Sequence, residues 1–349
     1  MAEVKLRGVS KSFDGIQAVQ DLSMTINDGE FVVLLGPTGA GKTTTLRLVA
    51  GLEIPNHGQI IIEDIDVTAL APSIRDVTFV FQQYSLYPHY TVFENMAFPL
   101  RAPGRNICVA DIKKQVTDVA EMLRISSKLN NKVTQLSGGE MQRVSIGRAL
   151  VRRPKVALMD EPLSSLDAKL REDLRVELKR IQKDLGTTIL YVTHDQLEAM
   201  TLADRVGILE QGRLIQIGSP KKVYEKPQNI CAARRLGSPP INLISPGTIG
   251  CEPQFNRAKT IGLRPEDIEI HLEKGLPARV ISIEHLGGES VVLLKANGQH
   301  IHSFLEHELE ISEGDNVFIT AKTAKQIEFD EDGDAILNNT AQPRSGRNG

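Results

Sequence analysis

Apolar runs and one helical pattern alternate in the middle of the chain. Residues 31–35, 156–159 and 188–193 are rich in apolar and β-branched side chains, which predicts buried strands. Between the last two runs, apolar residues recur at helical spacing: Leu170, Leu174, Leu178, Ile181 and Leu185. Gly186 follows and suits a helix C-cap. Strand, helix and strand in alternation predict an α/β domain with a parallel sheet wrapped by helices.

A second helical pattern lies before this segment. Ile112, Val116, Val119 and Leu123 recur at helical spacing, and the chain from about 93 to 153 has few strand-like runs. We therefore expect a helical subdomain at about 86–155, inserted in an α/β domain that spans 1–235.

The pattern changes after Leu236. Glycine, proline and serine are frequent over 237–247, which predicts a linker. Beyond it, strand-like runs without helical period lie at 279–283, 291–294 and 317–320. These predict a small all-β barrel domain of the oligonucleotide-binding (OB) type over 236–330. Residues 331–349 are acidic and then polar, which predicts a disordered tail.

Composition narrows the classes of function. The chain has 349 residues, and 41 Lys and Arg against 44 Asp and Glu give a net charge of −3. This balance gives no reason to expect a nucleic-acid partner. The three cysteines match no metal-site spacing, which favours free thiols in a reducing compartment. No segment reaches the roughly 18–20 apolar residues of a membrane span, and the first residues do not resemble a signal peptide.

The run at 31–35 leads directly into a phosphate-binding pattern. Residues 36–43 fit G-x-x-x-x-G-K-[ST] in the required order of strand, loop and helix. Backbone N–H groups of such a loop surround phosphates, the lysine reaches the β and γ phosphates, and the hydroxyl can bind Mg²⁺. The expected ATP-binding residues are Gly36, Pro37, Thr38, Gly39, Ala40, Gly41, Lys42, Thr43 and Thr44.

Two acids follow the second apolar run. Asp160 and Glu161 come directly after 156–159, at the edge where a parallel sheet presents its carboxyl ends. Asp160 suits the Mg²⁺ shell, and Glu161 suits a base that polarises the attacking water. The alternative is a strand that ends in two solvated acids without a function. The presence of Lys42 upstream argues against this alternative.

Residues 136–143, LSGGEMQR, resemble the signature loop LSGGQ of the ABC ATPase family. Ser137, Gly138, Gly139 and Glu140 would form a second phosphate-binding surface, which in that family faces the ATP of a partner subunit. Ser137 and Glu140 also make the pattern of a capping box, and both readings can hold together. Glu140 replaces the usual glutamine, which leaves the tightness of ATP capture open.

Further residues match the family in the same order along the chain. Gln82 matches the Q-loop residue, with a place in the Mg²⁺ shell and in catalysis. Asp167 matches the D-loop, and His194 matches the switch histidine that senses the γ-phosphate. Phe13 matches the aromatic residue that stacks on adenine, although it also suits a core phenylalanine. The resemblance thus implies catalytic roles for Glu161, His194 and Gln82.

Longer segments are similar to the carbohydrate-uptake branch, the maltose-type import ATPases. They are 81–95 (FQQYSLYPHYTVFEN), 193–205 (THDQLEAMTLADR) and 262–266 (GLRPE). That branch carries an OB-like barrel after its motor. The likeness is close to about 237 and weak beyond 268.

This resemblance implies the partners and the place of action. They are a homodimer or a closely related ABC ATPase, two integral membrane permease subunits, and indirectly an extracytoplasmic solute-binding protein. The chain would act at the cytoplasmic face of the membrane on a sugar, polyol or glycerol-phosphate importer. Tyr84, Tyr87 and Tyr90 either receive a permease helix or pack the helical subdomain.

Three alternatives stay open: a polyamine or metal-ion importer, an exporter, and a non-transport ABC ATPase. Exporters usually fuse membrane helices to the motor, and ribosome types carry two cassettes, whereas this sequence has one cassette and no such helices.

Overall fold

The computed structural model describes residues 2–305 and 309–336. The chain divides into two compact units, Met1–Lys221 and Lys222–Gly349, and each is considered separately. This division lies before the boundary that we expected at 235, so the helix at Ile230–Arg235 and most of the helix at Pro220–Glu225 belong to the second unit. The domain limits of 1–235 and 236–330 stay a prediction from the sequence.

A six-stranded sheet forms the centre of the first unit, in the order β10-β9-β3-β8-β7-β6. Five of its strands are parallel, and β10 pairs antiparallel with β9 at one edge. The three apolar runs become β3, β7 and β8, fully buried and adjacent. The strands are β3 (Phe31–Leu35), β6 (Val77–Val80), β7 (Val156–Asp160), β8 (Thr188–Thr193), β9 (Arg205–Glu210) and β10 (Arg213–Gly218).

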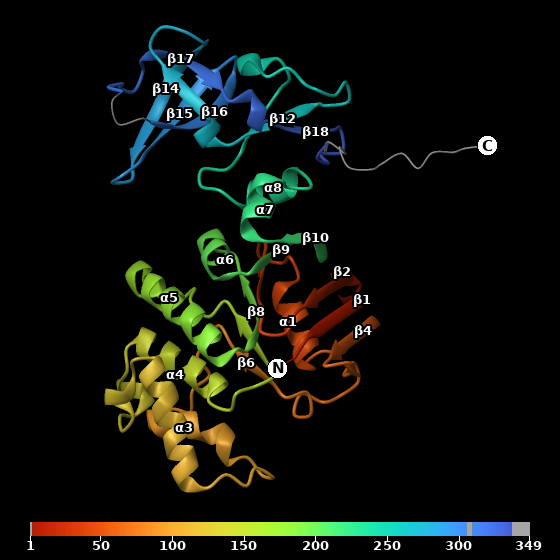
Figure 1. Ribbon diagram of the computed structural model, residues 1–349, viewed down its shortest axis with the longest axis vertical. Coiled ribbons are helices and arrows are strands. Elements are labelled where there is room, and N and C mark those ends of the chain that lie inside the picture. The colour runs from red at the N-terminus through yellow and green to blue at the C-terminus, as the bar shows by residue number, and fades with distance from the viewer. Residues whose placement is uncertain (1, 306–308, 337–349) are drawn as a thin grey trace, which may run out of the picture. The chain divides into compact units, whose positions relative to one another are not determined.

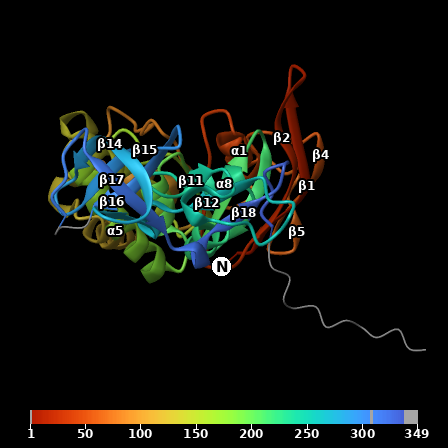
Figure 2. The ribbon, with the colours of Figure 1, turned by 90° about the horizontal axis from the view of Figure 1, so that it is seen from above.

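A second, antiparallel sheet stands beside the first, and α1 packs between them (Figures 1 and 2). One apolar core unites Leu6, Leu46 and Leu158, which come from β1, α1 and β7. This sheet was not predicted from the sequence. Its strands are β2 (Ile16–Ile26), β1 (Val4–Phe13), β4 (His57–Ile62) and β5 (Ile65–Asp66) in spatial order.

The helices of the first unit fall into two groups. α2 (Val92–Ala97), α3 (Val109–Met122) and α4 (Gly138–Leu150) lie together in the segment expected to be helical (Figure 1). α1 (Lys42–Ala50), α5 (Ala168–Leu185) and α6 (Gln196–Leu202) belong to the α/β part. α5 ends at Gly186, whose φ of 64° and backbone hydrogen bond to Gln182 make the expected C-cap.

The second unit begins with two short helices, and strands follow them. β14 (Leu276–His285), β15 (Ser290–Ala296) and β17 (Asn316–Ala321) contain the three predicted runs. With β13 (Ile268–His271) and β16 (Gln299–Leu305) they form a five-stranded antiparallel sheet. Ser303 Oγ on one edge strand donates to Ile268 O on the other at 2.7 Å, so the sheet curls toward a barrel. The other elements are α7 (Pro220–Glu225), α8 (Ile230–Arg235), β11 (Asn242–Ile244), β12 (Thr260–Leu263) and β18 (Ile327–Phe329).

Part of the expected tail is ordered. Residues 331–336 were assigned to a disordered segment, but Ala335 N donates to Gln228 O at 2.8 Å and Ile336 N donates to Glu328 O at 2.8 Å. Ile336 is also buried. The acidic composition predicted disorder, and the contact with Gln228, which is distant in sequence, leaves no local sign in the tail. The remaining tail residues, 337–349, lie outside the described part of the chain.

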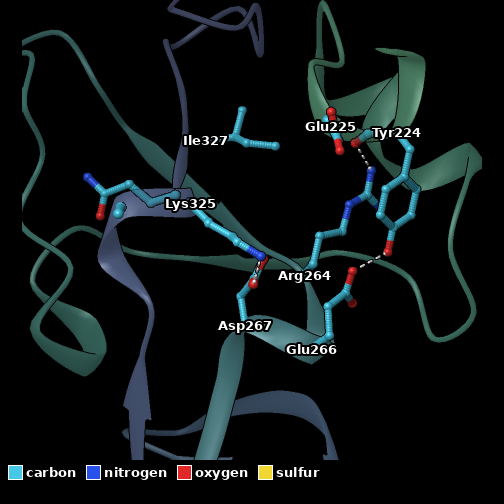
Figure 3. A pocket seen from close by; sticks show the side chains of 9 residues that line it. Tyr224, Glu225, Arg264, Glu266, Asp267, Lys325 and Ile327 are labelled. Atoms are coloured by element: carbon cyan, nitrogen blue, oxygen red, sulfur yellow. Dashed lines mark hydrogen bonds and ion pairs between the residues drawn. The ribbon is translucent and has the colours of Figure 1, made fainter. Parts of the chain in front are cut away.

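Arg264 holds the two helices of the second unit to its strands. Its guanidinium donates to Ala233 O, Leu236 O and Tyr224 O at 3.0, 2.6 and 2.7 Å and stacks on the Tyr224 ring (Figure 3). Burial lowers the pKa of this guanidinium. Beside it is a cavity of about 400 Å³, where Tyr224 also donates to Glu266.

Replacing Arg264 by alanine should destabilise the second unit. Three carbonyls, two of them in buried hydrogen bonds, would lose a charged donor, a change that costs about 2–3 kcal/mol. We expect its calorimetric unfolding transition in the full chain to move down by about 10 °C. Arg257→Ala, which removes an exposed arginine of the same unit, should leave the transition in place. Equal melting of both variants and the wild type would show that this arginine does not hold the helices.

Candidate functional site

The loop after β3 has the backbone of a phosphate cradle. Gly39 and Gly41 adopt φ values of 82° and 96°, a region that favours glycine. A Cβ on Gly36 would lie 2.2 Å from Leu209 O, and one on Gly41 would lie 2.3 Å from Ala18 O. Glycine is therefore required at both positions. The loop ends at the N-terminus of α1, where helix N–H groups attract anions.

Lys42 is almost fully buried inside this loop. Its ammonium group donates to Gly36 O at 2.9 Å and to Pro37 O at 3.0 Å. It also lies 3.5 Å from Glu161 Oε1. Thr38 and Gly39 at the loop tip are exposed, so the cradle is open to solvent above the buried ammonium. A buried positive charge inside a glycine-rich loop at a helix N-terminus fits a polyphosphate.

Thr43 and Asp160 meet beside the lysine. Thr43 Oγ1 donates to Asp160 Oδ1 at 2.9 Å. Burial raises the pKa of the Asp160 carboxyl, and the hydrogen bond from Thr43 opposes that shift. A hydroxyl and a carboxylate at the edge of the cradle are oxygen ligands of the type that Mg²⁺ prefers. The residues present therefore fit a magnesium ion bound together with phosphate.

Glu161 lies between the lysine and His194. Its Oε2 is 2.9 Å from His194 Nδ1, and its backbone N–H donates to Val192 O at 3.1 Å. β7 and β8 are parallel neighbours, so the residues that follow them meet at one edge of the sheet. Glu161 has a φ of 44°, which is unusual for a residue other than glycine and is found at functional sites.

Gln82 and Phe13 are not joined to this cluster. Gln82 is exposed after β6, and among the described residues it makes no hydrogen bond to Thr43 or Asp160. The structure therefore does not bring it into the expected magnesium shell. Phe13 lies at the end of β1, 41% exposed, with Lys11 Nζ 4.8 Å from its ring centroid. It is not a core phenylalanine, and its stacking on adenine stays a prediction.

The signature residues form the start of α4. Ser137 Oγ accepts from Glu140 N, and Glu140 Oε2 accepts from Ser137 N at 2.8 Å, so the expected capping box is present. That backbone hydrogen bond lowers the pKa of Glu140, whose charge is also paired with Lys128 at 3.3 Å. The negative charge that distinguishes Glu140 from glutamine is thus paired with groups of the same chain.

The second signature glycine, Gly139, has a structural reason as well. A Cβ on Gly139 would lie 2.0 Å from Leu170 Cδ2, so glycine lets α4 approach the side chains of α5. Asp167 caps α5 by accepting from Leu170 N at 3.0 Å. Within the described part of the chain, no hydrogen bond or ion pair links Ser137, Glu140 or Asp167 to Lys42.

Sequence reasoning missed two side chains that support this site. Arg171 Nη1 lies 3.4 Å from Asp195 Oδ2, and its Nη2 donates to Leu166 O at 3.0 Å. This arginine links the loop before Asp167 to the turn after His194. Asp195 also caps α6 by accepting from Leu197 N. Asp195 could have been found from the sequence, because an aspartate just before a helix is a typical N-cap. No local pattern identifies Arg171.

Comparison with protein families agrees with this geometry. Residues 19–164 match the model described as ABC transporter, and residues 261–326 match the TOBE domain model. The chain is 42% identical to the trehalose/maltose import ATP-binding protein MalK of Thermococcus litoralis, over 95% of this chain and 98% of that protein. The chain belongs to the ATP-binding subunits of ABC importers.

Two other relatives of this importer family differ in their solutes. An sn-glycerol-3-phosphate import ATP-binding protein UgpC of Agrobacterium fabrum is 46% identical over 84% of this chain and 87% of that protein. The osmoprotective compounds uptake protein GgtA of Synechocystis is 40% identical over 95% of this chain and 98% of its own length. The expected family and its ATPase activity are therefore confirmed, and the solute differs among relatives.

Solved ABC cassettes share the fold of the first unit. A dimeric post-hydrolysis cassette bound to ADP and Pi has a TM-score of 0.56 and 32% identity, over 62% of this chain and 98% of that one. CbiO1 of Clostridium perfringens has a TM-score of 0.59 and 28% identity, over 64% and 90%. The predicted α/β motor followed by a β-rich OB-like domain is confirmed. Among residues 2–305 and 309–336, no helix has the length and apolar character needed to cross a bilayer.

Proposed function

We propose that this importer subunit hydrolyses Mg-ATP at the Lys42 cradle and thereby drives uptake of a sugar, polyol or glycerol phosphate. The observation that carries the proposal is the position of Glu161, whose carboxylate lies between the Lys42 ammonium and the His194 ring. A lysine for phosphate, a carboxylate for water and a histidine for the γ-phosphate are thus already grouped in the isolated chain.

Each group has a role that follows from its chemistry. The loop N–H groups and Lys42 bind the phosphates, and Thr43 with Asp160 would hold Mg²⁺. When bound, the metal neutralises charge on the β and γ phosphates. Glu161 accepts a proton from the water that attacks the γ-phosphorus, while the bond from that phosphorus to the bridging oxygen breaks. His194, on the other side of Glu161, orients the carboxylate and contacts the γ-phosphate.

The proposal includes a dimer and membrane partners. The solved post-hydrolysis cassette is a dimer, and among the described residues no hydrogen bond or ion pair joins Ser137 to the chain's own Lys42. We propose that the surface formed by Ser137, Gly138 and Gly139, together with Asp167, serves the ATP of a second subunit, and that Gln82 completes the magnesium shell when the dimer closes. The chain would then act at the cytoplasmic face of the membrane.

An exposed aromatic cluster suits the permease contact. Tyr87, Tyr90 and Phe98 are each about two-fifths exposed, with ring centroids 4.6–6.3 Å apart. Arg148 lies 5.6 Å from the centroid of the Tyr87 ring. Aromatic rings and arginine are the side chains enriched at interface hot spots. Of the two readings left open for the tyrosines, this exposure favours a docking surface for a permease helix at Tyr87 and Tyr90, whereas Tyr84 is half-buried and contacts Ser165.

Uptake in a deletion strain tests the function as a whole. Labelled maltose, trehalose, glycerol 3-phosphate and putrescine would be offered to the strain, complemented with the wild type or with Glu161→Gln. We expect uptake of a sugar or of glycerol phosphate to fall to background and to return only with the wild type. Loss confined to putrescine would overturn the solute class. Unchanged uptake of every solute, against a chain that hydrolyses ATP in vitro, would favour a non-transport ATPase.

A further inference from the structure

The Tyr84 side chain meets two other loops that carry family motifs. Tyr84 follows Gln82 by two residues and is half-buried. Its Oη lies 3.2 Å from Ser165 Oγ, in the loop that connects Glu161 to the start of α5. The same Oη would lie 3.1 Å from a Cβ on Gly138, the first residue of α4. One phenol hydroxyl thus contacts the loop before Asp167 and lies beside the first residue of the signature helix.

The backbone around Tyr84 is fixed to the middle of α4. Tyr84 O accepts from Ser145 Oγ at 3.1 Å and from Arg148 Nη2 at 3.2 Å. Arg148 Nη1 donates to Ser85 O at 2.7 Å. Ser85 has a φ of 50°, and this left-handed residue turns the chain sharply after the tyrosine. A displacement of the segment that starts at Gln82 would therefore move both α4 and the tip of Tyr84.

The hydroxyl is not needed to fill space or to satisfy a buried group. Tyr84 is half-buried, so water can take the place of Ser165 as its hydrogen-bond partner. The contact therefore contributes little to the stability of the fold. The specific consequence of the contact is geometric, because it fixes the distance between two loops that lie on different elements. Gly138 contributes by lacking a side chain, since any Cβ there would press on the hydroxyl.

We propose that Tyr84 is a positioning residue, whose hydroxyl sets the signature loop and the 161–167 loop in register for hydrolysis in the dimer. This inference rests on the proposed function, because it assumes that both loops act on ATP. Movement of the segment at Gln82 would then reach both loops through one side chain. Tyr84 touches no reacting atom in this arrangement.

A double-mutant cycle in the full-length chain tests the proposal. Tyr84→Phe and Ser165→Ala should each lower kcat for ATP by about three- to tenfold, the effect of one uncharged hydrogen bond. The kcat of the double variant should be no lower than that of the less active single variant, because both changes remove the same contact. KM and the affinity for a fluorescent ATP analogue should stay within about twofold, since the Lys42 cradle is untouched.

Two further variants give the comparison. Ser165→Thr keeps a hydroxyl and should retain most of the activity. Tyr224→Phe removes a phenol hydroxyl from the second unit and should leave kcat unchanged. A wild-type kcat in Tyr84→Phe, additive effects in the double variant, or a raised KM at constant kcat would overturn the inference. Glu161→Gln is assayed beside them: if it still hydrolyses ATP at the wild-type rate, the proposed function itself has failed.

Discussion

Replacing Glu161 by glutamine is expected to lower ATP turnover by about 10²–10⁴-fold, the contribution typical of a positioned general base. The amide keeps the size and shape of the side chain but cannot accept the proton of the attacking water. The bonds from Lys42 to Gly36 O and Pro37 O do not involve this residue, so the cradle should survive. Steady-state phosphate release and equilibrium ATP binding, measured on the same preparation, separate the two effects.

The matched change elsewhere is Glu121→Gln, on the exposed side of α3. It alters the net charge equally and should leave both turnover and binding as they are. Near-wild-type hydrolysis by Glu161→Gln would mean that the base has been misassigned. Loss of ATP binding together with turnover would instead mean that the carboxylate is needed to hold Lys42, from which it lies 3.5 Å away.

The elements nearest the site could be predicted because their signals are local. β3 and β8 have the bounds that their apolar runs indicate, and α5 ends at the glycine expected to cap it. Buried parallel strands read as continuous apolar segments, and an amphipathic helix repeats every 3.6 residues. β3 and β8 are parallel neighbours, so they bring the cradle and the histidine turn to one edge of the sheet.

The antiparallel sheet could not be predicted in the same way. β1 pairs with β2 through several register shifts, and its other neighbour, β4, follows only after the strand, cradle and helix at 31–50. Bulges of this kind break the strict alternation that identifies a half-buried strand. Pairing between distant segments also leaves no local trace in a single sequence.

The supporting contacts of the site were hidden for a related reason. Arg75 is buried and caps the end of α1 by donating to Leu48 O and Val49 O, 27 and 26 residues away. The hydroxyls of Tyr84 and Ser165 are 81 residues apart in sequence. Motif matching identified the residues expected to touch ATP. It could not find the side chains that hold those residues, because these contacts join segments far apart in sequence.

Mixed dimers decide whether each ATP site is shared between two copies of the chain. One copy carries Lys42→Ala and the other carries Ser137→Arg, with Glu161→Gln in both to prevent hydrolysis. In a shared arrangement, one site collects both defects and the other is intact. Differently tagged mixed dimers should then retain about one nucleotide per dimer, because bound ATP supplies contacts that only the closed state has. If the sites are self-contained, each carries one defect. The mixed dimer would then retain no more nucleotide than the two mutant homodimers.

The reciprocal pairing removes the remaining ambiguity. Here both Lys42→Ala and Ser137→Arg are placed in one copy, and its partner copy keeps the wild-type residues at both positions. Shared sites would now each carry one defect, so retention should fall to the level of the mutant homodimers. Self-contained sites would leave the second copy intact, with about one nucleotide held per dimer.

The two pairings contain the same substitutions in the same number, so folding and expression cannot account for a difference between them. We expect retention in the first pairing alone, since Ser137 makes its hydrogen bonds with Glu140, and Lys42 makes its own with Gly36 and Pro37. Retention in the second pairing alone would establish that each chain completes its own site.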